Sequence, residues 1–291
     1  MNIIVTGACG QLGTELRNLS EGSAHHYIFT DIVRLPEEGV NLLDITDARA
    51  VEDFVASVKP DVIVNCAAYT NVDKAEDDPL GADLLNRAAV GNLARCAERA
   101  GAVLIHISTD YVFGGDARVP YKEDDAKKPL GVYGRTKLAG EAEVEASGCK
   151  AIVIRTSWLY SPYGKNFVKT MITLMASRDT VGVVADQTGS PTYAADLASA
   201  ITAMIDRNML SHTGVYHYSN QGVISWFDFA REIARINGSA CKVLPLRSSE
   251  FPSKVERPHY SVLDKSKIQE VFGVEVPYWK DSLEKCIERL K

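Results

Sequence analysis

Tyr133 and Lys137 stand four residues apart in the stretch PLGVYGRTKLAGE, residues 129–141. A loop containing proline and glycine precedes the tyrosine, and the residues after it predict a helix, so that the phenol and the ammonium share one helical face. A free phenol has a pKa of about 10, too high for efficient proton exchange near neutrality. A nearby ammonium would stabilise the phenolate and lower that pKa. A solvated helix face carries the same spacing, so the pair alone does not establish chemistry.

A second polar group, Ser108, Thr109, Asp110 and Tyr111, stands at the end of the apolar run AVLIHI. In a parallel sheet, substrates lie at the carboxyl ends of the strands, which is where this group would stand. Thr109 could hold a ketone oxygen by a hydrogen bond while Tyr133 gives that oxygen a proton and a hydride reaches the carbon. The order of the motifs along the chain therefore favours a carbonyl reduction.

A glycine-rich turn, GACGQLG at residues 7–13, joins the first apolar run to a predicted helix. Glycines at this place allow a sharp turn and a close approach of the backbone to a pyrophosphate, which the helix N-terminus then binds. The second apolar run ends at Asp31, whose carboxylate would accept hydrogen bonds from an adenosine ribose and repel a 2′-phosphate. Arg34 could instead receive a 2′-phosphate, so both NADH and NADPH remain open.

Apolar runs that alternate with helical stretches must position these residues. The runs lack strict polar alternation, as is typical of strands buried on both faces, and the alternation with helices predicts a doubly wound parallel sheet of the Rossmann type. The alternation loosens after residue 160. We therefore expect a nucleotide-binding domain over 1–160 and a smaller, loop-rich region over 161–291 that mainly binds substrate. Segments such as GVYHYSNQG, residues 214–222, are expected to return to the main sheet.

Composition excludes several classes of protein. The net charge of −6 comes with mixed signs along the chain, which argues against nucleic acid or an anionic membrane as the partner. The run MNIIVTG reads as a strand and a turn rather than a signal peptide, so we expect a cytoplasmic protein. The six cysteines have no CxxC spacing, which predicts reduced thiols and no metal site.

Seven motifs in order along the chain resemble those of the extended short-chain dehydrogenase/reductases, and among these the dTDP-4-dehydrorhamnose reductase family. They are GACGQLG (7–13), NCAAYTNVDKAE (65–76), STDYVF (108–113), YGRTKLAGE (133–141), RTSWLY (155–160), DQTGSPT (186–192) and RPHYS (257–261). The glycine and Tyr/Lys motifs are common to the superfamily, whereas the combination of STDYVF, RTSWLY and DQTGSPT is more specific to the rhamnose-pathway reductases.

The resemblance implies hydride transfer from NADH or NADPH to the C4 ketone of dTDP-4-dehydro-L-rhamnose, giving dTDP-L-rhamnose. Tyr133 would donate the proton, Lys137 would lower its pKa and hold the nicotinamide ribose, and Thr109 would orient the ketone. Cofactor contacts are implied for Gly7, Gly10, Gln11, Leu12, Gly13, Asp31, Asp44, Ile45, Ala68, Tyr69, Thr70 and Ile107, besides Tyr133 and Lys137.

The substrate end of the site would include Asp110 beside the sugar and Trp158 as a wall against it, by the same resemblance. Without the family, Trp158 would equally suit a core aromatic. We add Arg257 as a contact for the substrate diphosphate, because its planar fork suits phosphate oxygens. A surface salt bridge is the alternative for this arginine. The resemblance also raises Mg²⁺ dependence and a homodimer, although the sequence offers no carboxylate cluster to hold the metal.

Two other functions remain open at this stage. One is a related nucleotide-sugar epimerase or reductase, which would need an extra acid or base near the sugar. Asp110 and Tyr111 follow Thr109 here, which favours simple reduction. The other is a non-catalytic regulatory subunit of an S-adenosylmethionine-forming enzyme, which shares this fold. The complete set of Thr109, Tyr133 and Lys137 argues against it.

Overall fold

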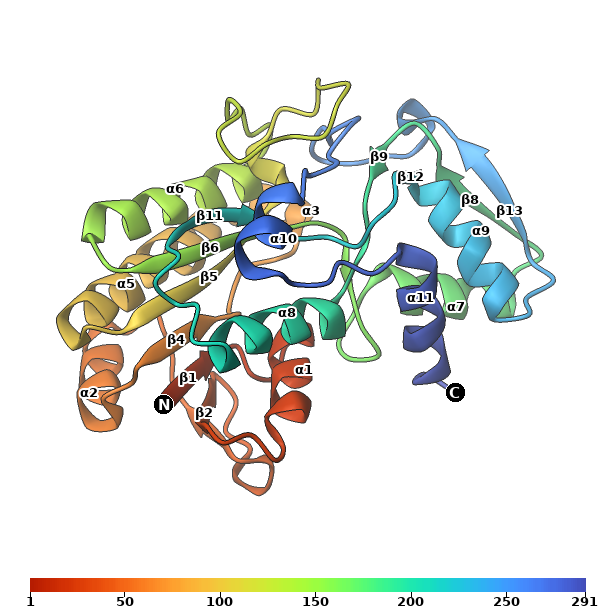
Figure 1. Ribbon diagram of the computed structural model, residues 1–291. Helices are drawn as coiled ribbons and strands as arrows, with labels where there is room; N and C mark the ends of the chain where they lie inside the picture. The colour runs from red at the N-terminus through yellow and green to blue at the C-terminus, as the bar shows by residue number, and fades with distance from the viewer.

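The computed structural model describes residues 1–291 and is built around a seven-stranded parallel sheet (Figure 1). Its strands are β1 (Asn2–Thr6), β2 (His26–Asp31), β3 (Val40–Leu42), β4 (Val62–Asn65), β5 (Val103–Thr109), β6 (Ala151–Thr156) and β11 (Gly214–His217). They lie in the order β11-β6-β5-β4-β1-β2-β3, and every neighbouring pair runs parallel. The strand order reverses between β1 and β4, which is where open sheets of this kind bind their ligands. The predicted fold class is confirmed.

Helices cover both faces of this sheet. Against one face pack α1 (Gln11–Ser20), α8 (Ala194–Asp206) and α10 (Ser266–Phe272), and against the other α2 (Ala48–Val58), α5 (Ala89–Ala100) and α6 (Val132–Ser147). Each face has its own core of aliphatic side chains, and the strands contribute to both, so that β4 reads as an unbroken apolar run, Val62-Ile63-Val64. None of the helices combines the length and the apolar character that spanning a membrane requires.

The chain before α5 departs from a single continuous helix. Two short helices, α3 (Val72–Asp77) and α4 (Pro79–Asp83), come first, and a π-helical turn (Leu84–Ala88) leads into α5. Asn86 in this turn explains the departure. Its side chain exchanges hydrogen bonds with the backbone of Tyr69, at 2.9 Å and 3.1 Å, and so ties the helix to the loop that follows β4. Such π-turns are common near functional sites.

Residues after 160 divide between the main sheet and a smaller body. α8, β11 and α10 join the main layer, with α8 packed on α1. The smaller body contains α7 (Phe167–Ser177), α9 (Trp226–Ile236) and α11 (Trp279–Glu288) around a third core. Three two-stranded ribbons complete it, made of β7 (Leu159–Tyr160) with β10 (Thr192–Tyr193), β9 (Thr188–Gly189) with β12 (Ile224–Ser225), and β8 (Thr180–Val184) with β13 (Lys242–Leu246).

Candidate active site

A pocket of about 750 Å³ opens at the carboxyl ends of the main strands, between the sheet and the smaller body. This pocket is lined by fourteen of the residues that we expected at the site. They are Gly7, Gly10, Gln11, Leu12, Asp31, Ala68, Thr70, Ile107, Thr109, Asp110, Tyr133, Lys137, Trp158 and Arg257. The topology thus brings together residues as far apart in the chain as Gly7 and Arg257, because the carboxyl ends of parallel strands share one edge.

The glycine turn forms one end of the pocket. Gly7 has φ +66°, a left-handed conformation, and a Cβ at this position would lie 2.6 Å from the backbone nitrogen of Ala67. A Cβ on Gly13 would lie 2.2 Å from the carbonyl oxygen of Gly7. Only glycine fits at these two places, so α1 begins directly under the turn and presents its free N–H groups to the pocket. This cradle suits the pyrophosphate of a dinucleotide.

Asp31 lies at the carboxyl end of β2, beside the same turn. Its Oδ2 accepts a hydrogen bond from the backbone nitrogen of Cys9 at 2.9 Å, and the residue lines the pocket. The carboxylate is therefore held in place next to the glycine turn, where a ribose would lie. Arg34 is exposed and does not line the pocket.

The chemical end of the pocket depends on where α6 begins. The backbone nitrogen of Val132 donates to Glu76 Oε1 at 2.6 Å, so a side chain from α3 satisfies the first turn of the helix. A Cβ on Gly134 would lie 2.2 Å from the carbonyl oxygen of Tyr111. This close approach lets the first turn of α6 rest against the backbone that follows β5, and it sets Tyr133 against the strand end.

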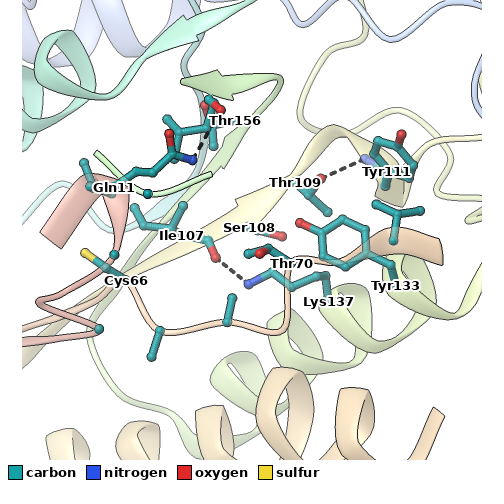
Figure 2. A pocket seen from close by; sticks show the side chains of 18 of the residues that line it. Gln11, Cys66, Thr70, Ile107, Ser108, Thr109, Tyr111, Tyr133, Lys137 and Thr156 are labelled. Carbon is teal, nitrogen blue, oxygen red and sulfur yellow. Dashed lines mark hydrogen bonds between the residues drawn. The ribbon is translucent and has the colours of Figure 1, made fainter. Parts of the chain in front are cut away.

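Tyr133, Lys137 and Thr109 meet in the pocket as the motif order predicted. Figure 2 shows the Tyr133 hydroxyl on the side of Thr109, and the Lys137 side chain reaching toward β5 from one turn further along α6. The Lys137 Nζ donates to the carbonyl oxygen of Ile107 at 2.6 Å (Figure 2). The phenol, the ammonium and the hydroxyl therefore face one space rather than solvent, so the solvated-face interpretation is wrong.

The pKa of Tyr133 departs from the expectation. Burial raises it to about 12, with a smaller upward contribution from Asp110 and a lowering contribution from the Thr109 side chain. The predicted lowering is not found, because the cost of removing a phenolate from water outweighs the hydrogen bond with Thr109. Burial also lowers the pKa of Lys137 to about 8, although Glu141 opposes that change. At neutral pH the phenol is thus a protonated donor and the lysine is still mostly an ammonium.

Asp110 is the most confined acid of the site, with 2% of its surface exposed. Its Oδ1 accepts a hydrogen bond from Thr109 Oγ1 at 3.1 Å, whereas Oδ2 has no partner. Burial raises the pKa of this carboxyl to about 7, and the nearby side chains of Ser261 and Thr109 oppose the rise. Near neutrality the group is therefore poised between its neutral and charged forms.

Trp158 and Trp226 form an aromatic wall on the side of the smaller body. The two indoles stack with ring centroids 3.6 Å apart and planes inclined by 12°. Trp158 has φ +48°, a left-handed conformation that costs a non-glycine residue energy. Both rings line the pocket. Strain kept at a pocket wall indicates that the ring's position matters there.

Arg257 lines the pocket and is paired with an acid. Its Nη2 donates to Asp73 Oδ2 at 2.8 Å, while Nε is buried without a partner. The salt bridge that was the alternative to a substrate contact thus exists, yet the side chain also lines the pocket. Nearby, Ser253 Oγ donates to Asp73 and Lys254 pairs with Asp77, so this whole segment is tied to α3.

Four of the expected cofactor residues do not line the pocket. The Gly13 backbone packs under the turn, and the Tyr69 hydroxyl turns to Asp78 Oδ2 at 3.3 Å. Asp44 accepts hydrogen bonds from Thr46, and Ile45 is buried in the core beneath α2 and α5. Their expected roles at the adenine and the loop stay predictions.

Several pocket residues were not expected from the sequence. Trp226 comes from α9, and Lys165 comes from the loop after β7, where Gly164 lies over Gln11. The only local signal was the position of Lys165 in the glycine- and proline-containing stretch SPYGKNF. The other unexpected residues are Cys9, Ile32, Cys66, Ala67, Val72, Leu85, Thr156, Ser157, Leu159 and Gly164, whereas Ser108 and Tyr111 belong to the polar group expected at the end of β5.

Comparison with known proteins identifies the family. The model of the RmlD substrate binding domain family matches residues 1–291. The chain belongs to this family. A dTDP-4-dehydrorhamnose reductase of Aggregatibacter actinomycetemcomitans is 38% identical over 290 residues, covering 97% of this chain and 96% of that protein.

Solved structures of the family agree with this assignment. A dTDP-4-dehydrorhamnose reductase from Clostridium acetobutylicum superposes with a TM-score of 0.92 at 42% identity, covering 100% of this chain and 99% of that one. The reductase from Bacillus anthracis, in complex with NADP, has a TM-score of 0.88 at 39% identity and covers 99% of both chains. Complexes of this kind support a nicotinamide cofactor for this RmlD-family protein. No three His, Cys, Asp or Glu side chains gather where they could hold a metal ion.

Proposed function

We propose that this protein is a reductase that transfers hydride from NADH or NADPH to the C4 ketone of dTDP-4-dehydro-L-rhamnose, giving dTDP-L-rhamnose. Membership of the RmlD family and the names of the relatives support the substrate. One structural observation carries the chemistry: Tyr133 and Lys137 face Thr109 in the same pocket as the glycine turn.

The bound nicotinamide cofactor supplies the hydride for the ketone carbon. The Thr109 hydroxyl, held at the end of β5, would hydrogen-bond the ketone oxygen and orient it. Tyr133 would give its proton to that oxygen, and its raised pKa keeps the proton on the phenol until then. The Lys137 ammonium would stabilise the resulting phenolate across the shared helical face.

The cofactor would be held by the glycine turn and by the loops after β2 and β4. Gly7, Gly10, Gln11 and Leu12 would contact the pyrophosphate at the start of α1. Asp31 would accept hydrogen bonds from the adenosine ribose, whereas the B. anthracis relative is in complex with NADP. NADH and NADPH should therefore both be measured with this protein.

The same loops and the lysine would complete the cofactor site. Ala68 and Thr70 would line the cofactor from the loop after β4, and Ile107 would do so from β5. Lys137 would also bind the nicotinamide ribose. The ends of three different parallel strands would thus enclose one dinucleotide, as the fold dictates.

The substrate would lie between β5 and the smaller body. Asp110 would border the sugar, Trp158 would form a wall against it, and Arg257 would contact the diphosphate with its planar fork. Residues 161–291 would thus mainly serve the substrate end, and residues 1–160 the cofactor end. The location would be cytoplasmic. Turnover with and without EDTA tests for Mg²⁺ dependence, and light scattering tests for a homodimer.

The deciding experiment follows the loss of NADH and NADPH absorbance with dTDP-4-dehydro-L-rhamnose present. Tyr133→Phe should lower kcat by about 100-fold or more, because general acid catalysis contributes factors of that size, while leaving cofactor binding nearly intact. Tyr218→Phe, the same change on a buried tyrosine outside the pocket, should leave turnover unchanged. Full turnover by Tyr133→Phe would remove the basis of the proposal.

A further inference from the structure

Three consecutive residues of β5 meet three residues of α6 that are four apart. The Ile107 carbonyl accepts from Lys137 Nζ at 2.6 Å, and Ser108 Oγ donates to Glu141 Oε1 at 2.5 Å. Thr109 faces Tyr133 (Figure 2). Glu141 thus continues the face that carries the phenol and the ammonium, one turn deeper along the helix. It does not line the pocket.

Arg155 on β6 holds the Glu141 carboxylate in a bidentate pair. Its Nε donates to Oε1 at 2.9 Å and its Nη2 to Oε2 at 2.7 Å. Arg155 is 2% exposed and Glu141 is 9% exposed, and the arginine is the direct partner of Ser108 in the β5–β6 ladder. The Arg155 Nη1 donates to the Glu123 carbonyl at 3.0 Å, and the guanidinium lies over the ring of Phe113. This ion pair therefore joins α6 to the two strands that end at the site.

A buried ion pair is not an efficient source of stability, because desolvation offsets most of the attraction, and apolar side chains of the same size would serve as well. The pair does, however, fix the position of α6 relative to β5. Glu141 can meet Ser108 and Arg155 together only when α6 lies in one register on β5. That register also places Lys137 at Ile107 and Tyr133 at Thr109.

Three titratable groups near Lys137 are neutral, so the Glu141 carboxylate is the charged group that most affects the pKa of Lys137. The thiol of Cys66, after β4, is neutral because burial raises its pKa to about 12. His106 on β5 is neutral because burial and Lys137 lower its pKa, and His217 behind Arg155 is neutral because burial lowers its pKa to about 3.

Other titratable groups on elements packed against α6 are paired elsewhere, lie on outer surfaces, or lie at the sugar end of the pocket. Glu76 binds the start of the helix, and Arg87 pairs with Asp83 and Glu143 on the outer face. Asp73 pairs with Arg257, and Lys74, Asp77, Asp78, Arg95, Glu98 and Arg99 lie on the outer surfaces of α3 and α5 or in the connection that follows α3. Asp110, Tyr111 and Tyr133 lie at the sugar end of the pocket.

We propose that the Glu141–Arg155 pair is a positioning device for the reaction, which holds α6 in register on β5 and balances the charge around the Lys137 ammonium. The inference rests on the proposed function, in which that ammonium stabilises the Tyr133 phenolate. Glu141 raises the pKa of Lys137 against the lowering effect of burial, which supports this assignment.

Single variants of the pair should move the alkaline limb of the kcat–pH profile in opposite directions. Glu141→Gln keeps an acceptor for Ser108 but leaves Arg155 as an unbalanced cation, so Lys137 loses its proton more easily and the limb moves down by about one pH unit. Arg155→Met leaves Glu141 to act on Lys137 alone, and the limb moves up. KM values should change by less than about twofold, since neither residue lines the pocket.

The double variant Glu141→Gln/Arg155→Met guards against misfolding, because removing both charges avoids an unpaired buried ion. Its limb should lie between those of Glu141→Gln and the natural protein. Glu143→Gln, a change on the outer face of the same helix, is the matched control and should leave the limb in place. Identical limbs in all folded variants, or movement of both single variants in the same direction, would overturn the proposal.

A second readout separates this inference from the proposed function. Competitive labelling of Lys137 with acetic anhydride, followed by peptide mass spectrometry, reports the titration of the amine without turnover. The same order of shifts is expected there. Absence of ketosugar reduction by the natural protein would refute the proposed function and leave the labelling result to decide the role of the pair. An unchanged titration of Lys137 in an active enzyme would refute the role of the pair alone.

Discussion

The buried carboxyl of Asp110 should make the protein less stable as the pH rises. Burial raises its pKa to about 7, whereas an aspartate in an unfolded chain titrates near about 3.9. The folded protein therefore binds this proton more tightly than the unfolded chain does. By linkage, the contribution of Asp110 to stability is fully present below about pH 4 and is lost progressively up to about pH 7.

Asp110→Asn removes this titration while keeping an acceptor for the Thr109 hydroxyl. Integrating the linkage relation from pH 5 to pH 8 with these two pKa values gives a loss of unfolding free energy on the order of 2 to 3 kcal/mol in the natural protein. The variant does not lose this contribution. Burying an amide N–H₂ without a partner has its own cost, on the order of 1 to 3 kcal/mol, but that cost is the same at both pH values. The difference in unfolding free energy between the variant and the natural protein should thus shift in favour of the variant by about 2 to 3 kcal/mol from pH 5 to pH 8.

Urea unfolding followed by circular dichroism at pH 5, 6, 7 and 8 measures this difference directly. Asp124→Asn, a change at an exposed aspartate, serves as the control and should show little dependence on pH. A difference between Asp110→Asn and the natural protein that stays constant within about 0.5 kcal/mol would refute the reasoning, since surface changes alone produce that much variation. It would mean that the carboxyl is ionised throughout, by a partner or a water that stabilises its charge.

Three further changes test the geometry. Gly134→Ala should destabilise the protein by about 1 to 3 kcal/mol and lower kcat, because the new Cβ would lie 2.2 Å from the Tyr111 carbonyl oxygen. Helix propensity alone predicts that alanine stabilises the protein, so a higher melting temperature in thermal unfolding would contradict the close packing. Trp226→Leu should weaken binding of the nucleotide sugar about 3- to 10-fold in calorimetry, with cofactor affinity unchanged, since an aromatic pair contributes about 0.5 to 1.5 kcal/mol. Asp73→Asn should lower the KM for the nucleotide sugar, because it frees Arg257 from its salt bridge. Arg257→Met should raise this KM about tenfold or more, as expected for a lost charge-assisted hydrogen bond. Equal KM values in both variants would exclude the diphosphate contact.

The sequence was informative wherever a few neighbouring residues carry the physics. The glycines at 7, 10 and 13 predict a turn and a helix start because glycine at this spacing allows a sharp turn and close packing of the helix on the strand. The spacing of Tyr133 and Lys137 predicts a shared helical face because the period of the helix is fixed. Apolar runs that end at Asp31 and Thr109 predict buried parallel strands, whose carboxyl ends must lie together. These local rules were enough to predict the fold class, and together with the family resemblance they named half of the residues that line the pocket.

Tertiary structure alone decided which distant residues meet, and how charge behaves among them. Trp226 stacks on Trp158 across 68 positions of sequence, and Arg155 reaches Glu141 because β6 returns beside β5. The pKa of Tyr133 was expected to be lowered by its neighbour and is raised instead. The physical reason is that burial depends on everything packed around a group, and no spacing along the chain encodes how much water a folded pocket excludes.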